Sequence, residues 1–564
     1  MFIRVNTTAN SPRRSVQIVE SKRMGSKVKT KIIRHVGIAH DDFELAKLRA
    51  LACDIIAKIS LVAQQSSRQL TLFPQTQNEI SMNLQQQLAA KRGRPPIRQL
   101  QDMVPPNQVT LDSILEQKRV TEGVGEVCSV IYGELGFEKI LNSRQDKLLK
   151  DLVFARIGAP CSKRKLSTLL ELKFDKDYEL DRIYRMMDKL VPKIELVKLR
   201  VFEATKTLLP EPINLMLFDV TTLYFESEDT DDLRAFGYSK DCKFNNTQLV
   251  LALATNTDGL PIGYELFKGN TAEVSTLLFS LEKWKQNLSI KDVCFVGDRA
   301  MFSEANLDLM DKHGYKYVVA AKMRNMKSVI TKEILNEANY KSAEFGSEVG
   351  LIAEFKYQNR RLISGYKHSR SMRDAKIRQR ILDKIEKSLS KDKKTLQLPS
   401  NRGVRKYTTS LARSQVILDQ AKVDADKAWD GIHGVITNIT DQSPLEVLKC
   451  YSRLWAIEES FRINKYNLKM RPIYHWKQRR IESHIAICYM SFAILRHLQY
   501  RVKLTQKLSV ESIMEELMNV QASIYVHEST GHQYRVPGSM SHKASKIYRA
   551  LGLRRSLHAE AYVQ

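Results

Sequence analysis

The chain has few of the features that mark a secreted, zinc-stapled or membrane-spanning protein. Its seven cysteines among 564 residues are scattered and form no Cys-x-x-Cys pair, which argues against a disulfide framework or a structural zinc site and favours a reducing compartment. The longest uncharged apolar run, residues 485–495, is shorter than the ~20 residues of a transmembrane helix, and the N-terminus has no apolar signal core. We therefore expect a cytoplasmic, nucleoid-associated protein with no membrane partner.

Acidic residues are also in short supply. The chain carries 90 lysines and arginines against 63 aspartates and glutamates, which gives a formal net charge of +27. Residues 1–100 carry +11 and residues 351–500 carry +16, whereas residues 201–350 carry −6. A protein this basic attracts polyanions, so nucleic acid is the expected partner. The acidic block requires a separate explanation.

The length exceeds that of one compact domain, and three regions precede the acidic block. Residues 1–64 are predicted to form a basic β-hairpin followed by a helix. Residues 65–110 are rich in Gln, Asn, Ser and Pro and are expected to be a linker. Residues 111–210 show helical periodicity and predict a small helical domain for DNA binding or assembly.

Residues 211–502 are predicted to form an α/β catalytic domain. Three apolar strand-like runs, two of them joined by the hairpin signal Asp258-Gly259, precede a helix, a strand, a helix and a strand. This order is typical of an RNase H-like sheet, although order alone does not exclude other α/β folds. Residues 321–440 mix short strands with a charged helix and are expected to be a β-containing insertion. Residues 503–564 are less patterned and are expected to be a C-terminal tail region.

Two aspartates follow apolar runs in this domain. Asp219 ends the run LMLFD, and Asp298 ends the run VCFVGD. Carboxylates at the ends of buried strands usually lie at the edge of a sheet, where open α/β folds bind ligands. Two of them on neighbouring strands would repel each other unless a cation lay between them. The alternative is that each aspartate caps the turn or helix that follows it.

A third carboxylate lies on a helix predicted for residues 444–469. Residues 443–446 form a capping box with proline at the first helical position. Polar residues interrupt the apolar face of this helix at intervals of seven, at Tyr451, Glu458 and Lys465. A half-buried carboxylate requires a cation, and the lysine two turns away suggests a nearby phosphate. The alternative is an ordinary ion pair between Glu458 and Arg462, four residues on.

The stretch YSRLWAIEESFRINK, residues 451–465, resembles the Tyr-x2-Arg-x3-Glu-x6-Lys signature of bacterial insertion-sequence DDE transposases of the RNase H-like class. The blocks FDVTTLYFES, DGLPIGYELFKGNT, FVGDRAMF and IEESFRINKYNLKMRPIYH resemble those of one branch of that group, over roughly residues 213–500. The resemblance implies a catalytic and metal-binding triad of Asp219, Asp298 and Glu458. It also implies that Tyr451 and Lys465 contact DNA.

One position departs from the signature, because Leu454 stands where the family has arginine. Arg453 comes one residue early, about 200° around the helix from the signature tyrosine. Arg462, on the Glu458 face, is the expected substitute for the missing phosphate contact. The adjacent Glu459 lies about 100° from Glu458 and is the second candidate for the third carboxylate.

The resemblance implies a transposase that binds the terminal inverted repeats of its element, cuts the 3′ ends and joins them to target DNA. Phosphodiester cleavage requires an activated oxygen nucleophile and a stabilised leaving oxygen, which two divalent ions about 3.5 to 4 Å apart supply together. Three carboxylates suit two Mg²⁺ ions, for which Mn²⁺ could substitute. The expected partners are double-stranded DNA, at the element ends and the target, and further copies of the chain in a homo-oligomer.

Two other functions stay open. An RNase H-like nuclease or resolvase would cleave DNA without strand transfer, and an inactive transposase-derived protein would only bind DNA. The complete set of three carboxylates and the continuous blocks argue against the inactive protein. A strand-transfer assay separates the first alternative from a transposase.

Two basic segments are candidates for DNA contact, RRLISGYKHSRSMRDAKIRQR and KMRPIYHWKQRR. The second contains Tyr474 and Trp476, which would either stack on an unpaired base near a cleaved end or be ordinary interior aromatics. His475, His484 and His497 lack the spacing of metal ligands and are expected to be core or surface residues.

The predicted linker contains the sequence KRGRPP, which resembles the core of an AT-hook. In such a motif, glycine lets the backbone settle on the floor of a narrow A·T minor groove, and the flanking arginines extend along it. A basic, proline-rich linker is an equal alternative. If the motif is a hook, Arg92 and Arg94 are further DNA-binding residues.

Overall fold

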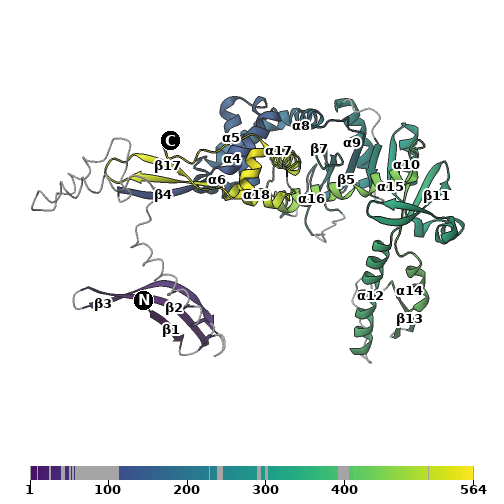
Figure 1. The fold of residues 1–564 in the computed structure, drawn as a ribbon, viewed down its shortest axis with the longest axis horizontal. Helices are drawn as coiled ribbons and strands as arrows, with labels where there is room; N and C mark the ends of the chain where they lie inside the picture. The colour runs from purple at the N-terminus through teal and green to yellow at the C-terminus, as the bar shows by residue number, and fades with distance from the viewer. Residues whose placement is uncertain are drawn as a thin grey trace, which may run out of the picture. The chain divides into compact units, whose positions relative to one another are not determined.

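The computed structural model describes most of the chain (Figure 1). The described residues are 2–8, 11–24, 27–39, isolated positions between 45 and 56, 113–227, 229–237, 245–288, 294–298, 303–391, 406–412, 415–505 and 507–562. They belong to two compact units, Met1–Gln108 and Val109–Gln564. Arg92 and Arg94 of the AT-hook-like motif lie outside the described residues.

The first unit contains a three-stranded antiparallel sheet in the order β1-β2-β3. Its strands are β1 (Phe2–Thr8), β2 (Ser11–Met24) and β3 (Lys27–Ala39). Pairing of β2 with β3 confirms the predicted N-terminal hairpin. The sequence pattern did not indicate β1. Val16 and Ile18 of β2 are fully buried in a small core with Leu45 and Ala52.

A nine-stranded mixed sheet forms the centre of the second unit. Five of its strands are β5 (Leu215–Tyr224), β6 (Gln248–Thr255), β7 (Pro261–Lys268), β8 (Cys294–Gly297) and β9 (Lys316–Ala320). They lie in the order β7-β6-β5-β8-β9. Strands β5, β6 and β7 are antiparallel, and β5, β8 and β9 are parallel. This order and these directions confirm the predicted RNase H-like α/β fold.

Strands from the predicted insertion extend the same sheet beyond β9. They are β10 (Lys341–Phe345), β11 (Glu348–Tyr357), β12 (Arg360–Tyr366) and β15 (Ile432–Thr437), preceded by α11 (Ser328–Leu335). Between β12 and β15 the chain forms α12 (His368–Lys391), β13 (Thr408–Ala412), β14 (Gln415–Leu418) and α14 (Gln420–Lys427). Figure 1 shows α12 beside α14 and β13, apart from the sheet, and a small core of Ile385, Tyr407 and Val423 joins them.

Helices cover both faces of the central strands. The helices on one face are α9 (Glu273–Leu288) and α10 (Glu304–Lys312). Those on the other are α15 (Pro444–Ser452), α16 (Trp455–Arg462) and α17 (Gln478–Lys503). Because side chains alternate along a strand, Phe218 and Val220 of β5 join the core with α9 and α10, whereas Leu217 and Leu223 join the core with α16 and α17.

Helix α17 is buried from Ile481 to Leu498, apart from the half-buried Glu482, because other helices surround it. They are α4 (Gly123–Glu134), α5 (Ser143–Gly158), α7 (Leu180–Leu190), α8 (Ile194–Leu208), α18 (Val510–Met518) and α19 (His542–Ala550), with α6 (Lys163–Phe174) beside α5 and α7. No helix among the described residues has both the length and the hydropathy required to cross a bilayer.

The segment expected to be a tail is folded onto the start of the helical region. Strand β4 (Ile114–Thr121) pairs with β16 (Gln521–His527) in a four-stranded sheet that β17 (Gln533–Pro537) and β18 (Glu560–Ala561) complete. Its strands come from opposite ends of the unit, so no local pattern indicates their pairing.

Arg496 of α17 joins three parts of the catalytic domain. It is 3% exposed and donates hydrogen bonds to the carbonyl oxygens of Asp258 and Gly259, at 2.6 and 2.9 Å, in the turn between β6 and β7. Its third nitrogen pairs with Glu459 of α16 at 2.9 Å. Gly259 has a φ of +76°, and a Cβ there would overlap the guanidinium, so the turn requires glycine.

We predict that Arg496→Met lowers the free energy of unfolding by about 3 kcal/mol, because it leaves two carbonyls without their donor and removes the buried partner of the Glu459 carboxylate. Arg501→Met, on the same helix, should cost less than about 1 kcal/mol, because Arg501 pairs with Glu134 at the surface. Denaturant titrations of both variants test this. Equal losses would contradict the anchoring role of Arg496.

Candidate active site

The register of β5 with β8 brings two of the predicted acids level with each other. The strands are parallel neighbours, paired Leu215 with Cys294 and Leu217 with Val296. Asp219 follows Leu217 by two residues, and Asp298, the first residue after β8, follows Val296 by two. Neighbouring strands lie about 4.8 Å apart, so this register places both carboxylates at the same height in the sheet.

Both aspartates belong to the face of the sheet that α16 covers. Side chains two residues apart on a strand point to the same face, so Asp219 faces the same way as Leu217, and Asp298 the same way as Val296. Leu217 and Val296 both lie in the core shared with α16 and α17. Helix α16 packs directly against β5 and β6. Asp219, Asp298 and the helix that carries Glu458 are therefore on one side of the sheet.

The sequence prediction that Asp219 ends its strand is wrong. Strand β5 continues to Tyr224, because its pairing with β6 runs on past Asp219, which lies opposite Leu253. Asp298, in contrast, directly follows the last residue of β8 and is exposed. The Asp219 side chain is half-buried and accepts a hydrogen bond from the Val220 N–H at 2.7 Å.

The predicted single helix at 444–469 is also wrong. Helix α15 begins with the expected capping box but ends at Ser452, and α16 starts at Trp455 after a turn. A π-helical turn, Ile463–Asn467, then replaces the α-helix and contains Lys465. Tyr451, Glu458 and Lys465 consequently lie on three successive segments rather than along one straight stripe.

Glu458 and Glu459 differ in their surroundings. Glu458 is exposed, and no described residue hydrogen-bonds or pairs with its carboxylate. Glu459 is 20% exposed and pairs with Arg496 and, at 3.4 Å, with Arg462. Arg462 also approaches Glu511 at 3.7 Å. Arg462 therefore pairs with Glu459 and Glu511 and not with Glu458. A carboxylate already paired with a buried arginine is a poorer ligand for a metal than an unpaired one.

The donor chemistry of the three acids fits Mg²⁺, which prefers hard oxygen ligands. Their side chains do not surround a common point, however: across the described ranges, no three His, Cys, Asp or Glu side chains are close enough to hold a metal ion. Assembly of a metal site would therefore require the Asp219, Asp298 and Glu458 carboxylates to move closer together.

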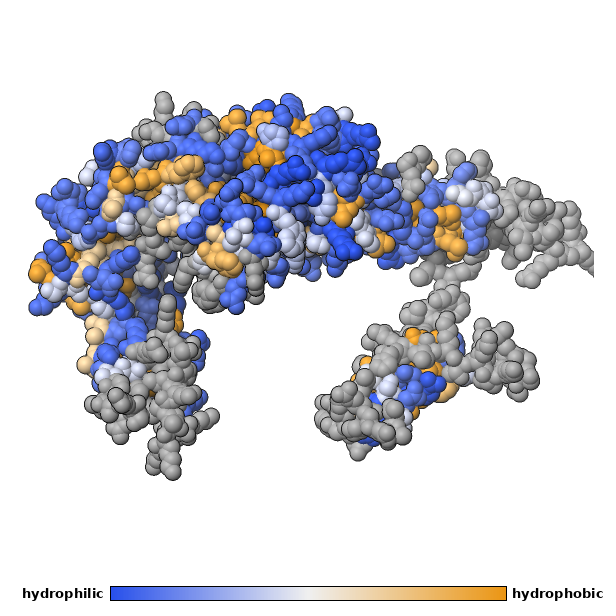
Figure 2. All heavy atoms as spheres, turned by 180° about the vertical axis from the view of Figure 1, so that it is seen from behind, coloured by the Kyte–Doolittle hydropathy of each residue, from blue (hydrophilic) through white to orange (hydrophobic). Residues whose placement is uncertain are grey.

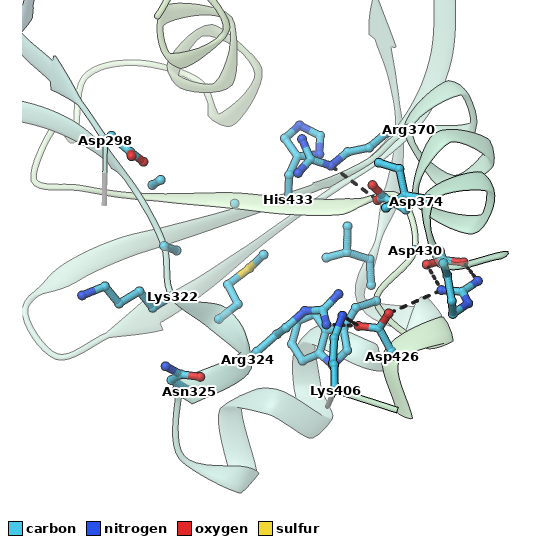
Figure 3. Close-up of a pocket in the computed structure, with 18 of the residues that line it drawn as sticks. Asp298, Lys322, Arg324, Asn325, Arg370, Asp374, Lys406, Asp426, Asp430 and His433 are labelled. Carbon is cyan, nitrogen blue, oxygen red and sulfur yellow. Dashed lines mark hydrogen bonds and ion pairs between the residues drawn. The ribbon is translucent and has the colours of Figure 1, made fainter. Parts of the chain in front are cut away.

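A pocket of ≈ 930 Å³ opens beside Asp298 (Figure 3). Its walls come from β9 and the turn after it, α12, α14 and β15, and Tyr451 of α15 also lines it. Figure 3 places Asp298 and Lys322 on one side and Asp426 and Asp430 on the other. The predicted DNA-contacting tyrosine thus shares a pocket with a predicted catalytic aspartate.

The acids on the far side of this pocket are held in ion pairs. Asp426 accepts hydrogen bonds from Arg324, Lys406 and Tyr407, and Arg378 pairs with Asp430. Burial opposes ionisation of Asp426, but these hydrogen bonds outweigh it and hold its pKa well below the usual range. These groups fix α12 and α14 to each other, whereas Asp298 lies outside this network.

The departure from the family signature has a clear local structure. Leu454 is 7% exposed and packs in the core below α16. Arg453 is exposed and lines a different pocket, together with Glu446 and Lys449. Neither residue lines the pocket that contains Asp298 and Tyr451. The sequence analysis missed the pocket cations nearest the ends of the parallel strands, such as Lys322. The position of Lys322 just after the apolar strand β9 was a signal that could have identified it.

Helix α12 carries a one-sided cationic stripe. It holds eight lysines and arginines against three acids. At 100° per residue, five of the cations fall within about 80° of arc over a length of about 21 Å. This α12 stripe comprises Arg373, Lys376, Arg380, Lys384 and Lys387, all exposed. The residues of α12 that line the pocket, such as Asp374 and Ile381, lie about 100° away around the helix.

Figure 2 shows a mostly hydrophilic surface with small, separate hydrophobic patches.

The aromatic residues of the second basic segment are at the surface. Tyr474 is 57% exposed and Trp476 is 64% exposed, so they are not interior aromatics. The three histidines, in contrast, are buried. Burial is the main cause that lowers the pKa of His475 to about 3 and of His497 to about 4, and that holds the pKa of His484 far below its usual value.

The family assignment follows from residues 210–494, just over half of the chain, which match the model of the Transposase DDE domain. The chain belongs to this transposase family. A solved structure titled "Cryo-EM structure of piggyBac transposase synaptic complex with hairpin DNA (SNHP)" is similar at 9% sequence identity and a TM-score of 0.38, over 70% of this chain and 77% of that one. No curated protein matches the chain.

We predict that the protein loses stability on acidification because of its buried histidines. The pKa of His497 is about 4 when folded and near 6.5 when unfolded, so the unfolded state takes up the proton first and stability falls as the pH drops below about 6.5. His497→Gln should remove roughly 2 kcal/mol of the loss between pH 7 and pH 5. His558→Gln, at an exposed position, should keep the wild-type dependence in the same denaturant titrations.

Proposed function

We propose that the protein is a metal-dependent DDE transposase that cuts the 3′ ends of its element and joins them to target DNA. The observation that carries this proposal is the register of β5 with β8, which sets Asp219 and Asp298 level on the face covered by α16. Family membership supports transposition as the process. In this proposal Asp219, Asp298 and Glu458 are the catalytic carboxylates.

The three carboxylates would hold two Mg²⁺ ions, or Mn²⁺ in their place. Bound there, the ions would supply an activated oxygen nucleophile and charge stabilisation at the leaving oxygen. Two aspartates at strand spacing repel each other, so their free energy falls when positive charge lies between them. The exposed Glu458 side chain has the freedom to complete the ligand set.

Cleavage and joining are two displacements at phosphorus. In cleavage, a water oxygen bonds to phosphorus, the P–O3′ bond breaks and the element strand retains a 3′-hydroxyl. In joining, that hydroxyl bonds to a phosphorus of the target strand and a target 3′-hydroxyl leaves, so one phosphodiester forms for each one broken. Tyr451, Arg462 and Lys465 would hold phosphate oxygens in place. The pocket that Tyr451 shares with Asp298 supports this role for the tyrosine.

Duplex DNA at the element ends and at the target would bind to the basic surfaces that flank the acids. The α12 stripe is the strongest candidate, because its cations lie on one side of a helix whose adjacent side lines the pocket with Asp298. A stripe about 21 Å long spans about six phosphates of one strand at 3.4 Å each. Joining two element ends would require a homo-oligomer on the DNA. Arg92 and Arg94 would add minor-groove contacts on A·T-rich DNA.

We predict that Glu458→Gln reduces Mg²⁺-dependent cleavage by ~100-fold or more, because it removes one charged ligand of the site. Its melting temperature should match that of the wild type, because no described residue pairs with this carboxylate. A nicking assay on DNA that carries the element end measures the first effect. A parallel assay for joined product distinguishes a transposase from a nuclease or resolvase.

Glu459→Gln is the matched control, because it makes the same change one residue away. It should lower the melting temperature by weakening the contact with Arg496 and leave cleavage by the folded protein near the wild-type rate. Wild-type cleavage by Glu458→Gln together with inactive, stable Glu459→Gln would identify Glu459 as the third carboxylate.

A separate prediction concerns the α12 stripe. Replacing Arg373, Lys376 and Arg380 together with glutamine should weaken duplex binding and reduce the slope of log K against log salt by about 2.7, since each phosphate contact contributes about 0.9. Binding titrations at several salt concentrations measure this slope. Glutamine at Lys543, Lys546 and Arg549 of α19 removes the same formal charge and should leave the slope nearly unchanged. Equal slopes in the two variants would mean that α12 does not contact DNA.

A further inference from the structure

The segment after the π-helical turn presents two aromatic rings on one side. From Ile473, which forms a β-bridge, to Trp476 the chain is neither helix nor turn, and burial alternates residue by residue. Ile473 and His475 are 2% and 9% exposed, whereas Tyr474 and Trp476 are 57% and 64% exposed. Because side chains alternate along an extended chain, both exposed rings project from the same side, about 6.6 Å apart along the backbone.

The inward-facing residues fix this segment in place. Ile473 forms an isolated parallel bridge with Phe225, just after β5, and its N–H donates to the Tyr224 carbonyl oxygen at 3.1 Å. The His475 ring lies edge-on to Tyr184, with ring centres 6.1 Å apart, and 5.3 Å from the His484 ring. The exposure of Tyr474 and Trp476 is therefore a feature of an anchored segment.

The surroundings of the two rings are cationic. Residues 469–480 contain five lysines and arginines and no acid, although two of the five, Arg479 and Arg480, pair with Asp188 of α7. The Arg471 guanidinium lies over the rings of Tyr224 and Tyr466, at 5.5 and 5.7 Å from their centres. Aromatic rings flanked by positive charge favour single-stranded nucleic acid, because every base offers a face for stacking and every phosphate a negative charge.

We propose that Tyr474 and Trp476 form a stacking platform for unpaired nucleotides next to the cleaved DNA end. This inference rests on the proposed function, because the segment joins the end of β5, the strand that carries Asp219. Six residues of β-strand separate Asp219 from Phe225, which is about 20 Å, or about six nucleotide steps. The spacing of the rings matches about two base steps of 3.4 Å. The platform would thus hold a single-stranded flank several nucleotides from the scissile phosphate.

The test compares the binding of three fluorescent probes to the full-length protein in EDTA, where cleavage does not occur. The probes are a blunt duplex and the same duplex with a ten-nucleotide overhang at its 3′ or its 5′ end. The wild type should prefer at least one overhang probe to the blunt one by ~5-fold or more, in keeping with base–aromatic stacking. Tyr474→Ala with Trp476→Ala should abolish that preference and leave blunt-duplex affinity within about two-fold.

Two control variants separate stacking from a general loss of structure. Phe279→Ala removes an aromatic ring of similar exposure from α9 and should retain the overhang preference. Trp476→Phe keeps an aromatic face and should also retain the overhang preference. Because this variant lacks the Trp476 indole, single-stranded DNA should no longer quench that residue's share of the protein fluorescence. Unchanged melting temperatures would verify that each variant is folded.

The outcomes that overturn the proposal are distinct from those that overturn transposase activity. The same preference in the wild type and the double alanine variant, or none in the wild type, would exclude the platform even if the protein cleaves and joins DNA. A double variant that changes oligomeric state without changing overhang preference would identify a protein contact and also overturn it. Loss of cleavage in Glu458→Gln bears on the proposed function alone.

Discussion

The parallel pairing of β5 with β8 is the constraint on which the candidate site depends. Its register sets Asp219 and Asp298 level, and strand periodicity turns both toward α16. A slip of one residue in β8 would turn Asp298 to the opposite face, toward α9 and α10, and would bury a carboxylate among apolar side chains. The cost of burying that carboxylate opposes the slip. The same core that folds the sheet therefore also fixes the relative position of two acids that repel each other.

The acidic site and the basic surfaces are separated by the packing of the insertion. Arg324, Arg378 and Lys406 neutralise Asp426 and Asp430 and fix α12 against α14, so these cations serve the structure. The α12 stripe, about 100° away on the same helix, is exposed. A polyanion bound along it would not need to break the ion pairs of these two largely buried carboxylates, and leaving a buried charge without its partner costs far more than losing a surface contact. One side of α12 is therefore held by ion pairs within the protein, and another side presents unburied positive charge to the solvent.

Features encoded by local pattern were predictable, and features set by distant contacts were not. The apolar runs of β5 and β8, the capping box of α15 and the charged helix α12 are visible within a few residues. The order of elements indicated the RNase H-like fold but did not by itself exclude other α/β folds. The pairing of β4 with β16 joins residues some four hundred positions apart, so no sequence period reveals it. Asp219 was expected at a strand end because a polar residue usually interrupts a buried strand, but pairing with β6 carries β5 onward. For the site, the acids were evident from the sequence, whereas their relative placement was not.

The break between α15 and α16 explains why the adjacent residues Glu458 and Glu459 have different surroundings. In one continuous helix, Glu458 would have lined up with Tyr451 and Lys465, and Glu459 would have lain about 100° from that line. The turn after Ser452 gives α16 its own direction, and Arg496 then holds Glu459 from α17 at 2.9 Å while bonding to the turn between β6 and β7. That contact fixes the rotation of α16 about its axis, because a buried guanidinium with four fixed acceptors tolerates little displacement. Glu458, about 100° further round, is thereby kept at the surface with an unpaired carboxylate, which is the state a metal ligand requires.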